Sequence, residues 1–248
     1  MTLTEHLDEL RTTVIRVVII LTVSFFLAYG FGHYIAEFLL QPLRRALGET
    51  ASGQVVYIGL LDKVLAQLQV AFWTSIIISS PLWFYQIWHF IRPGLYQHEA
   101  RAVKPFLIVG FFLFCAGIAF GYYLVFPVTF EMLLAFGVTD VNAMISMRDY
   151  LVLTSKVLVF LGIIFQLPNA MLILGFMGLV TKQSLRSYRS YVYVAFAGVA
   201  AMLTPPDIMT LSALWLPLVT LYEVGIWVVA IIVHPYLARQ HGFKSKKG

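Results

Sequence analysis

Charge is scarce in this chain. Only 12% of its 248 residues are Asp, Glu, Lys or Arg, whereas 60% are hydrophobic. Almost none of the charge falls inside the long apolar stretches, such as residues 17–36, 64–91 and 105–130. This composition is typical of an integral membrane protein and argues against a soluble domain.

Residues and motifs that carry covalent or metal chemistry are also missing. Cys115 is the single cysteine, so the chain can form neither an internal disulfide nor a cysteine-based metal site. His98-Glu99 does not extend to a His-Glu-x-x-His zinc motif, and no Gly-x-Ser-x-Gly motif occurs. We therefore expect no catalytic residues, no metal and no cofactor, and we do not expect an enzyme.

What the chain does contain is a series of apolar runs separated by short polar segments. About 20 helical residues are needed to cross roughly 30 Å of hydrocarbon. The runs predict an all-α integral membrane protein with one membrane domain over residues 1–248. We expect six spans, at residues 15–34, 65–88, 106–126, 150–174, 190–203 and 210–233.

The last two spans are expected to be short, because two prolines in Thr204-Pro205-Pro206-Asp207 divide the final apolar run. Residues 191–203 would give a helix of only about 20 Å, at 1.5 Å per residue. This length predicts thinning of the bilayer or shelter by neighbouring helices.

Lysine and arginine predict the orientation. With the N-terminus inside, four of these residues fall on outer segments and twelve on inner segments. The positive-inside rule then places both termini in the cytoplasm. The net charge of +5 thus reflects topology and gives no indication of nucleic-acid binding. The four outer residues are Arg44, Arg45, Lys63 and Arg148.

Three connecting segments are expected to have structure of their own. Thr2-Leu-Thr-Glu5 reads as a capping box, which predicts a short amphipathic surface helix before the first span. Residues 35–47 predict an outer helix interrupted at Pro42, and residues 127–149 a second outer cap. The acidic N-terminus lacks the basic region and cleavage site of a secretory signal, so we expect the first span to stay in the mature protein.

Two carboxylates, Glu9 and Glu99, are predicted on the inner face of the membrane. Each could accept a guanidinium group through two hydrogen bonds, a geometry that favours arginine over lysine. The alternative is that Glu9 complements the helix dipole and Glu99 pairs with Arg92 or Arg101.

Polar residues are also predicted inside the spans. Gln166 and Asn169 flank Pro168, and they could either face a partner helix or satisfy the proline break internally. Lys156 is expected to extend to the outer interface. Glu223, near the middle of the sixth span, could be protonated or could bond to a neighbour.

Four motifs resemble those of the TatC family in order and spacing, and together they cover essentially the whole chain. They are Glu5-His-Leu-Asp-Glu9-Leu-Arg11, the segment from Tyr85 to Glu99, Phe165-Gln-Leu-Pro168 and Leu203-Thr-Pro-Pro-Asp207.

The resemblance implies a receptor of the twin-arginine translocase, with a concave, glove-like fold in a bacterial or archaeal inner membrane. It implies binding of twin-arginine signal peptides at the cytoplasmic face through Glu9 and Glu99, supported by Arg11 and Phe90. It also implies assembly with small single-span Tat subunits, a homo-oligomer within the complex, and export of folded proteins by the proton-motive force. Structural roles are implied for Pro42, Pro81, Pro93, Pro168, Pro205, Pro206, Tyr122 and Asp207.

One position departs from the family pattern. Many members carry a glutamate in the fourth span where this chain has Gln166. Both a protonated glutamate and a glutamine can donate a hydrogen bond, so contact with a partner helix could survive while titration there would be lost.

A proton-coupled solute permease is the alternative function. A permease should show an internal repeat and a ring of polar groups at mid-membrane depth. This chain has no detectable repeat between its two halves, and its polarity concentrates on the inner surface. The receptor interpretation therefore fits better.

Overall fold

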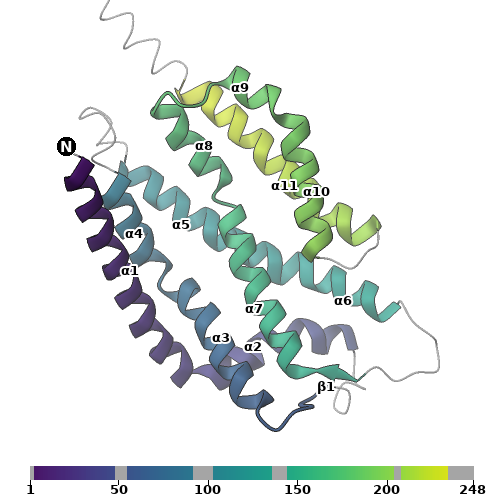
Figure 1. Cartoon of the computed structure of the whole chain (residues 1–248). Helices are drawn as coiled ribbons and strands as arrows, with labels where there is room; N and C mark the ends of the chain where they lie inside the picture. Colours follow the sequence, from purple (N-terminus) through teal and green to yellow (C-terminus); the bar gives the residue numbers. More distant parts are fainter. Residues whose placement is uncertain (1–2, 48–54, 92–102, 136–143, 204–207, 234–248) are drawn as a thin grey trace, which may run out of the picture. The chain divides into compact units, whose positions relative to one another are not determined.

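The apolar runs form helices throughout the part of the chain that can be described. The computed structural model describes residues 3–47, 55–91, 103–135, 144–203 and 208–233 (Figure 1). The chain divides into two units, Met1–Gly162 and Ile163–Gly248, and each is described separately.

The first unit contains most of the helices and one short pair of strands. Its helices α1 and α2 are followed by α3 and α4, and then by α5, which continues through the π-helical turn η4 into α6. The bounds are α1 (Leu3–Gly30), α2 (Gly32–Leu47), β1 (Val55–Val56), α3 (Asp62–Ile78), α4 (Ser80–Ile91), α5 (Val103–Phe120), η4 (Gly121–Val125), α6 (Phe126–Ala135), β2 (Ile145–Ser146) and α7 (Met147–Ile164), whose last two residues belong to the second unit.

In the second unit, α11 packs against both α8 and α10. Hydrogen bonds tie α11 to two further points: Tyr222 Oη donates to the carbonyl of Leu185 on α9 at 2.8 Å, and Trp215 Nε1 donates to that of Tyr193 on α10 at 2.9 Å. The elements are α8 (Leu167–Phe176), α9 (Lys182–Ser187), α10 (Arg189–Leu203), α11 (Ile208–Val228) and the π-helical turn η5 (Val229–Val233).

Four helical stretches among the described residues are long and apolar enough to cross a membrane, and the bent pair α3–α4 would make a fifth. The helix α10 has 15 residues, about 22 Å at 1.5 Å each, so the expected short fifth helix is confirmed. The expectation of a short sixth span is wrong. Its candidate span has 24 residues because the helix starts at Ile208, directly after the proline segment, and continues through Pro217.

The N-terminal surface helix expected before the first span does not exist as a separate element. Residues 3–30 form one helix of 28 residues. Between Leu3 and Tyr29 the sequence contains neither glycine nor proline, so nothing interrupts the hydrogen-bond ladder.

The expected interruption at Pro42 is also wrong, because α2 runs through this residue. Proline has no N–H to donate to the carbonyl four residues earlier, which here belongs to Phe38. Tyr122 supplies the missing donor: its hydroxyl donates to the Phe38 carbonyl at 2.8 Å, and its ring stacks on the Phe38 ring at 4.4 Å. The helix thus keeps its geometry through a partner from η4.

The second predicted span is broken at Ser79, where α3 and α4 meet at 56°. The hydroxyl of Ser79 donates to the carbonyl of Ser75 at 2.5 Å, and Trp83 Nε1 donates across the bend to the carbonyl of Ile76 at 2.9 Å. Pro81 lies in the first turn of α4, where its missing N–H costs little. Trp83 therefore supplies a donor to the Ile76 carbonyl at the bend, whereas the Ser75 carbonyl also accepts from the Ser79 N–H.

The third span extends further than expected. We expected an outer cap from Pro127, but α6 continues to Ala135. Pro127 cannot bond to the preceding turn, and the π-helical turn Gly121–Val125 lies directly before it. The wider turn lets the helix pass the proline.

Candidate functional site

The N-terminal half of α1 carries the first predicted receptor residues. Glu9 is half-buried and Arg11 is exposed. Within the described ranges, no lysine, arginine or histidine forms an ion pair with Glu9. Its carboxylate is therefore available to a cation from outside these ranges.

The end of α4 carries the next predicted residue, Phe90, which is half-buried. The helix α1 packs against α3 and α4. Figure 1 shows that α1 begins, α4 ends and α5 begins at the same end of this unit. The structure thus brings the helix ends that carry Glu9, Arg11 and Phe90 to one end of the unit, whereas Glu99 and Pro93 lie outside the described residues.

Gln166 and Asn169 lie where α7 gives way to α8. Gln166 is the residue before α8, and Pro168 occupies the first turn of this helix. Asn169 Nδ2 donates to Gln166 Oε1 at 3.4 Å, so the two amides satisfy each other in part. Asn169 is 4% exposed, and its Oδ1 has no hydrogen-bond partner among the described atoms. This bond joins the two amides and does not involve the carbonyl that Pro168 frees, and one acceptor of Asn169 remains.

Glu223 proves to be bonded to neighbours on α10. Arg189 donates to Glu223 Oε2, and the hydroxyl of Tyr193 donates to Oε1 at 2.5 Å. In the sequence, Arg189 stands out only as one of the positive charges on the inner segments. Arginine and glutamate 34 positions apart carry no sequence signal of contact beyond the rarity of a carboxylate within an apolar run.

Comparison with known proteins then decides the family. The family model described as "Sec-independent protein translocase protein (TatC)" matches residues 5–217. The chain belongs to the TatC family. Its function is therefore that of the twin-arginine translocase, and it is a multi-pass membrane protein.

Individual relatives align with this chain over most of their length. The chain is 39% identical to TatC of Desulforapulum autotrophicum, covering 90% of this chain and 82% of that protein. It is 32% identical to TatC of Escherichia coli K12, covering 90% and 85%. A solved structure titled "Crystal Structure of Twin Arginine Translocase Receptor- TatC" matches with a TM-score of 0.80 and 30% identity, covering 91% of this chain and 98% of that one.

Several predicted positions remain without a structural description. Pro205, Pro206 and Asp207 lie outside the described residues, as do Pro93 and Glu99. Of the family positions that are described, Pro42 is buried in α2, Pro81 begins α4 and Pro168 begins α8, so each proline lies at a point where a helix needs special accommodation.

Proposed function

We propose that this chain is the signal-peptide receptor subunit of the translocase, with six spans, both termini in the cytoplasm and a concave, glove-like form. In this proposal Glu9 and Glu99 bind the two arginines of the signal peptide, supported by Arg11 and Phe90. The chain acts in a bacterial or archaeal inner membrane. It assembles with further copies of itself and with single-span subunits, and folded cargo crosses by use of the proton-motive force.

The observation that carries this proposal is the environment of Glu9. It is a half-buried carboxylate without an ion-pair partner among the described residues, and it belongs to a helix that begins where α4 ends. A carboxylate that is partly removed from water gains from a guanidinium partner, since charge-assisted bidentate pairs are stronger than neutral hydrogen bonds. Glu99 follows the end of α4 by eight positions in sequence, and in this proposal it binds the same peptide.

Binding of a synthetic twin-arginine signal peptide to the purified chain tests the proposal. The double substitution Glu9→Ala with Glu99→Ala should weaken binding by about 1.5 kcal/mol, the low end for a charge-assisted bond, because Glu9 is not fully buried. Asp8→Ala provides the matched control, since Asp8 is an exposed acid beside Glu9 on the same helix. A twin-lysine peptide should bind the parent more weakly than the twin-arginine peptide. Equal affinity of the double variant and the parent at moderate salt would contradict the assignment.

Gln166 and Asn169 are proposed to contact a single-span partner. The support is the half-buried amide of Gln166 at the junction of α7 and α8, because an amide at this depth gains from an interhelical hydrogen bond. Such bonds contribute about 0.6 kcal/mol on average. Gln166→Leu should therefore reduce co-purification of the partner without unfolding the chain, and unchanged recovery would leave Gln166 with a packing role only.

A further inference from the structure

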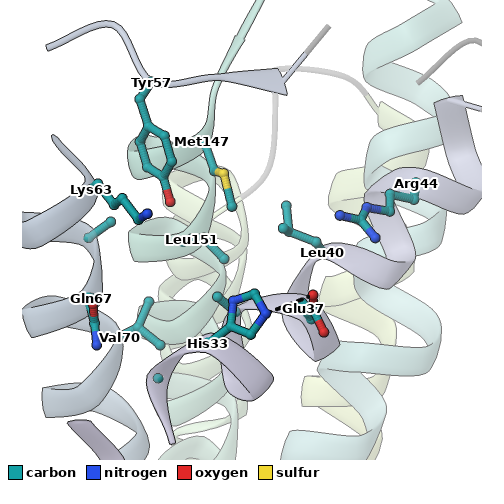
Figure 2. Close-up of a pocket in the computed structure, with 13 residues that line it drawn as sticks. His33, Glu37, Leu40, Arg44, Tyr57, Lys63, Gln67, Val70, Met147 and Leu151 are labelled. Atoms are coloured by element: carbon teal, nitrogen blue, oxygen red, sulfur yellow. Dashed lines mark ion pairs between the residues drawn. The ribbon is translucent and has the colours of Figure 1, made fainter. Parts of the chain in front are cut away.

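A cavity of about 280 Å³ lies among α2, α3 and the start of α7, entirely within the first unit. Figure 2 shows its lining. The Lys63 ammonium group and the Tyr57 hydroxyl point into the cavity from one side, and the Arg44 guanidinium group from the other. This space is distinct from the helix ends that carry Glu9 and Phe90.

The strand pair builds one wall of the cavity. Strands β1 and β2 are parallel, with Val56 opposite Ser146, so the next residues, Tyr57 and Met147, arrive side by side. Both line the cavity. Tyr57 and Met147 are thus placed by a strand pairing between segments that lie 90 residues apart in the sequence.

A second interaction fixes the loop that precedes Lys63. The carboxylate of Asp62 accepts a hydrogen bond from the Gly59 N–H at 2.6 Å and pairs with Arg148 at 3.1 Å. Asp62 is thereby neutralised by Arg148, and it does not neutralise the adjacent Lys63. The ammonium group of Lys63 is left for the cavity.

The charges at the cavity do not balance. Among the described residues that line it, Glu37 is the single carboxylate, and it lies 3.1 Å from His33 on the same helix, so two cations, Arg44 and Lys63, face one negative charge. Across the described ranges, no carboxylate lies within ion-pair distance of Arg44 or Lys63. Tyr57 adds a hydroxyl donor, and partial burial raises its pKa, which keeps the proton in place. The cavity therefore presents cationic and neutral donors to an anion.

The remaining wall is apolar. Leu40, Val70 and Leu151 are buried and line the same space. A purely hydrated anion would gain nothing from this wall, whereas a molecule with an anionic head and a hydrocarbon part would use both surfaces. A volume of 280 Å³ lies just below the range of roughly 300 to 1,000 Å³ typical of small-molecule sites, so it accommodates a headgroup and not a whole lipid.

The position along the helices agrees with such a ligand. The first candidate span ends at Gly30, and the cavity begins at Gly32, whose added Cβ would meet the Gln67 side chain at 3.0 Å. The cavity thus lies where the span ends, at the level of the lipid headgroups. Arginine and lysine at this level can pair with the phosphate group of an anionic lipid.

We propose that this cavity binds the phosphate of an anionic phospholipid, with Arg44 and Lys63 as its cationic contacts and Tyr57 as a hydrogen-bond donor. The acyl chains leave along the apolar wall of Leu40, Val70 and Leu151 into the bilayer. Bound lipid would bridge α2 and α3 and would hold the segment after β1 in place.

Native mass spectrometry of the full chain in neutral detergent tests this proposal. Phosphatidylglycerol is titrated against phosphatidylcholine with the same acyl chains, and inorganic phosphate is added as a competitor. The test variant is Arg44→Gln with Lys63→Gln. The matched control, Arg45→Gln with Lys182→Gln, removes the same charge, and neither of its residues lines the cavity. Ala36→Leu fills the cavity with both cations intact.

Affinity for the first phosphatidylglycerol should fall roughly tenfold in the test variant and less than about twofold in the control. The expected loss is modest because Arg44 and Lys63 are exposed, and water screens exposed charges. Ala36→Leu should lower it as well, and phosphatidylcholine should bind the parent more weakly. Equal phosphatidylglycerol affinity in the test and control variants would overturn the site. Displacement of the lipid by inorganic phosphate at equal concentration would overturn the lipid as its ligand. Neither result would bear on signal-peptide binding.

Discussion

Arg189, the first residue of α10, forms an ion pair with Glu223 on α11. Tyr193, one turn further along α10, donates to the other oxygen of the same carboxylate. The side chains of Arg189 and Glu223 are 35% and 27% exposed. Because α10 has only 15 residues, this network is a major link between the short helix and its neighbour.

Removing one partner of this pair should destabilise the second unit. Glu223→Leu leaves Arg189 without its counter-charge, which we expect to cost about 1–3 kcal/mol, less than for a fully buried pair. Arg189→Met combined with Glu223→Leu should recover part of this loss, since an apolar pair of similar size carries no unpaired charge. Denaturant unfolding in detergent, arranged as a double-mutant cycle, measures the coupling. Additive effects of the two substitutions would show that the pair contributes nothing as a pair.

The stability of the fold should depend on Tyr122, because Pro42 cannot donate to the Phe38 carbonyl. Tyr122→Phe removes the donor to the Phe38 carbonyl and leaves a part-buried acceptor unpaired, at a cost of about 1 kcal/mol. Tyr123→Phe is the control, since Tyr123 is the next residue and is 69% exposed. In a Pro42→Ala background the alanine N–H can bond to the Phe38 carbonyl, so Tyr122→Phe should cost less there. Thermal unfolding of the five proteins decides this, and an equal cost of Tyr122→Phe in both backgrounds would contradict the explanation.

Features that depend on neighbouring residues could be predicted from the sequence, whereas features that depend on distant residues could not. Helix content and the short fifth helix were predictable because hydrophobic run length and proline position are local properties. The uninterrupted α2 was not, because the donor to the Phe38 carbonyl lies 84 residues from Phe38, at Tyr122. Local rules predict that Pro42 interrupts α2, but the Tyr122 hydroxyl supplies the missing hydrogen-bond donor.

The candidate sites show the same limit. The polar pair Gln166 and Asn169 could be selected from their isolation in apolar surroundings, and Glu9 from its predicted place on the inner face and its motif. The partner of Glu223 and the cavity between Arg44 and Lys63 could not, because both depend on contacts between distant segments. Side chains can be chosen from sequence, but their partners come from the fold.

Asp62 should order the loop after β1. Asp62→Ala removes both the acceptor for the Gly59 N–H and the partner of Arg148, so the loop should become more mobile. A spin label at Leu60, which is 99% exposed, would report this as a narrower spectrum without disturbing packing. Asp149→Ala is the control, because Asp149 is an acid next to Arg148 that forms no ion pair among the described residues. If the label is equally mobile in the parent and in Asp62→Ala, Asp62 does not order the loop.

Gly162 should be intolerant of even one methyl group. A Cβ at this position would lie 2.7 Å from Phe114 Cε2 and 2.8 Å from Cδ2, and the Phe114 ring is fully buried, so it has little room to move. Gly162→Ala should therefore destabilise the protein by about 1–3 kcal/mol through overpacking. Gly198→Ala is the matched control, since a Cβ there meets nothing within 4 Å and alanine favours helix by up to about 1 kcal/mol. Phe114→Leu makes room at the contact, so Gly162→Ala should cost less in that background than in the parent. Melting temperatures of the five proteins provide the measurement, and a Gly162→Ala variant as stable as Gly198→Ala would show that the ring can yield.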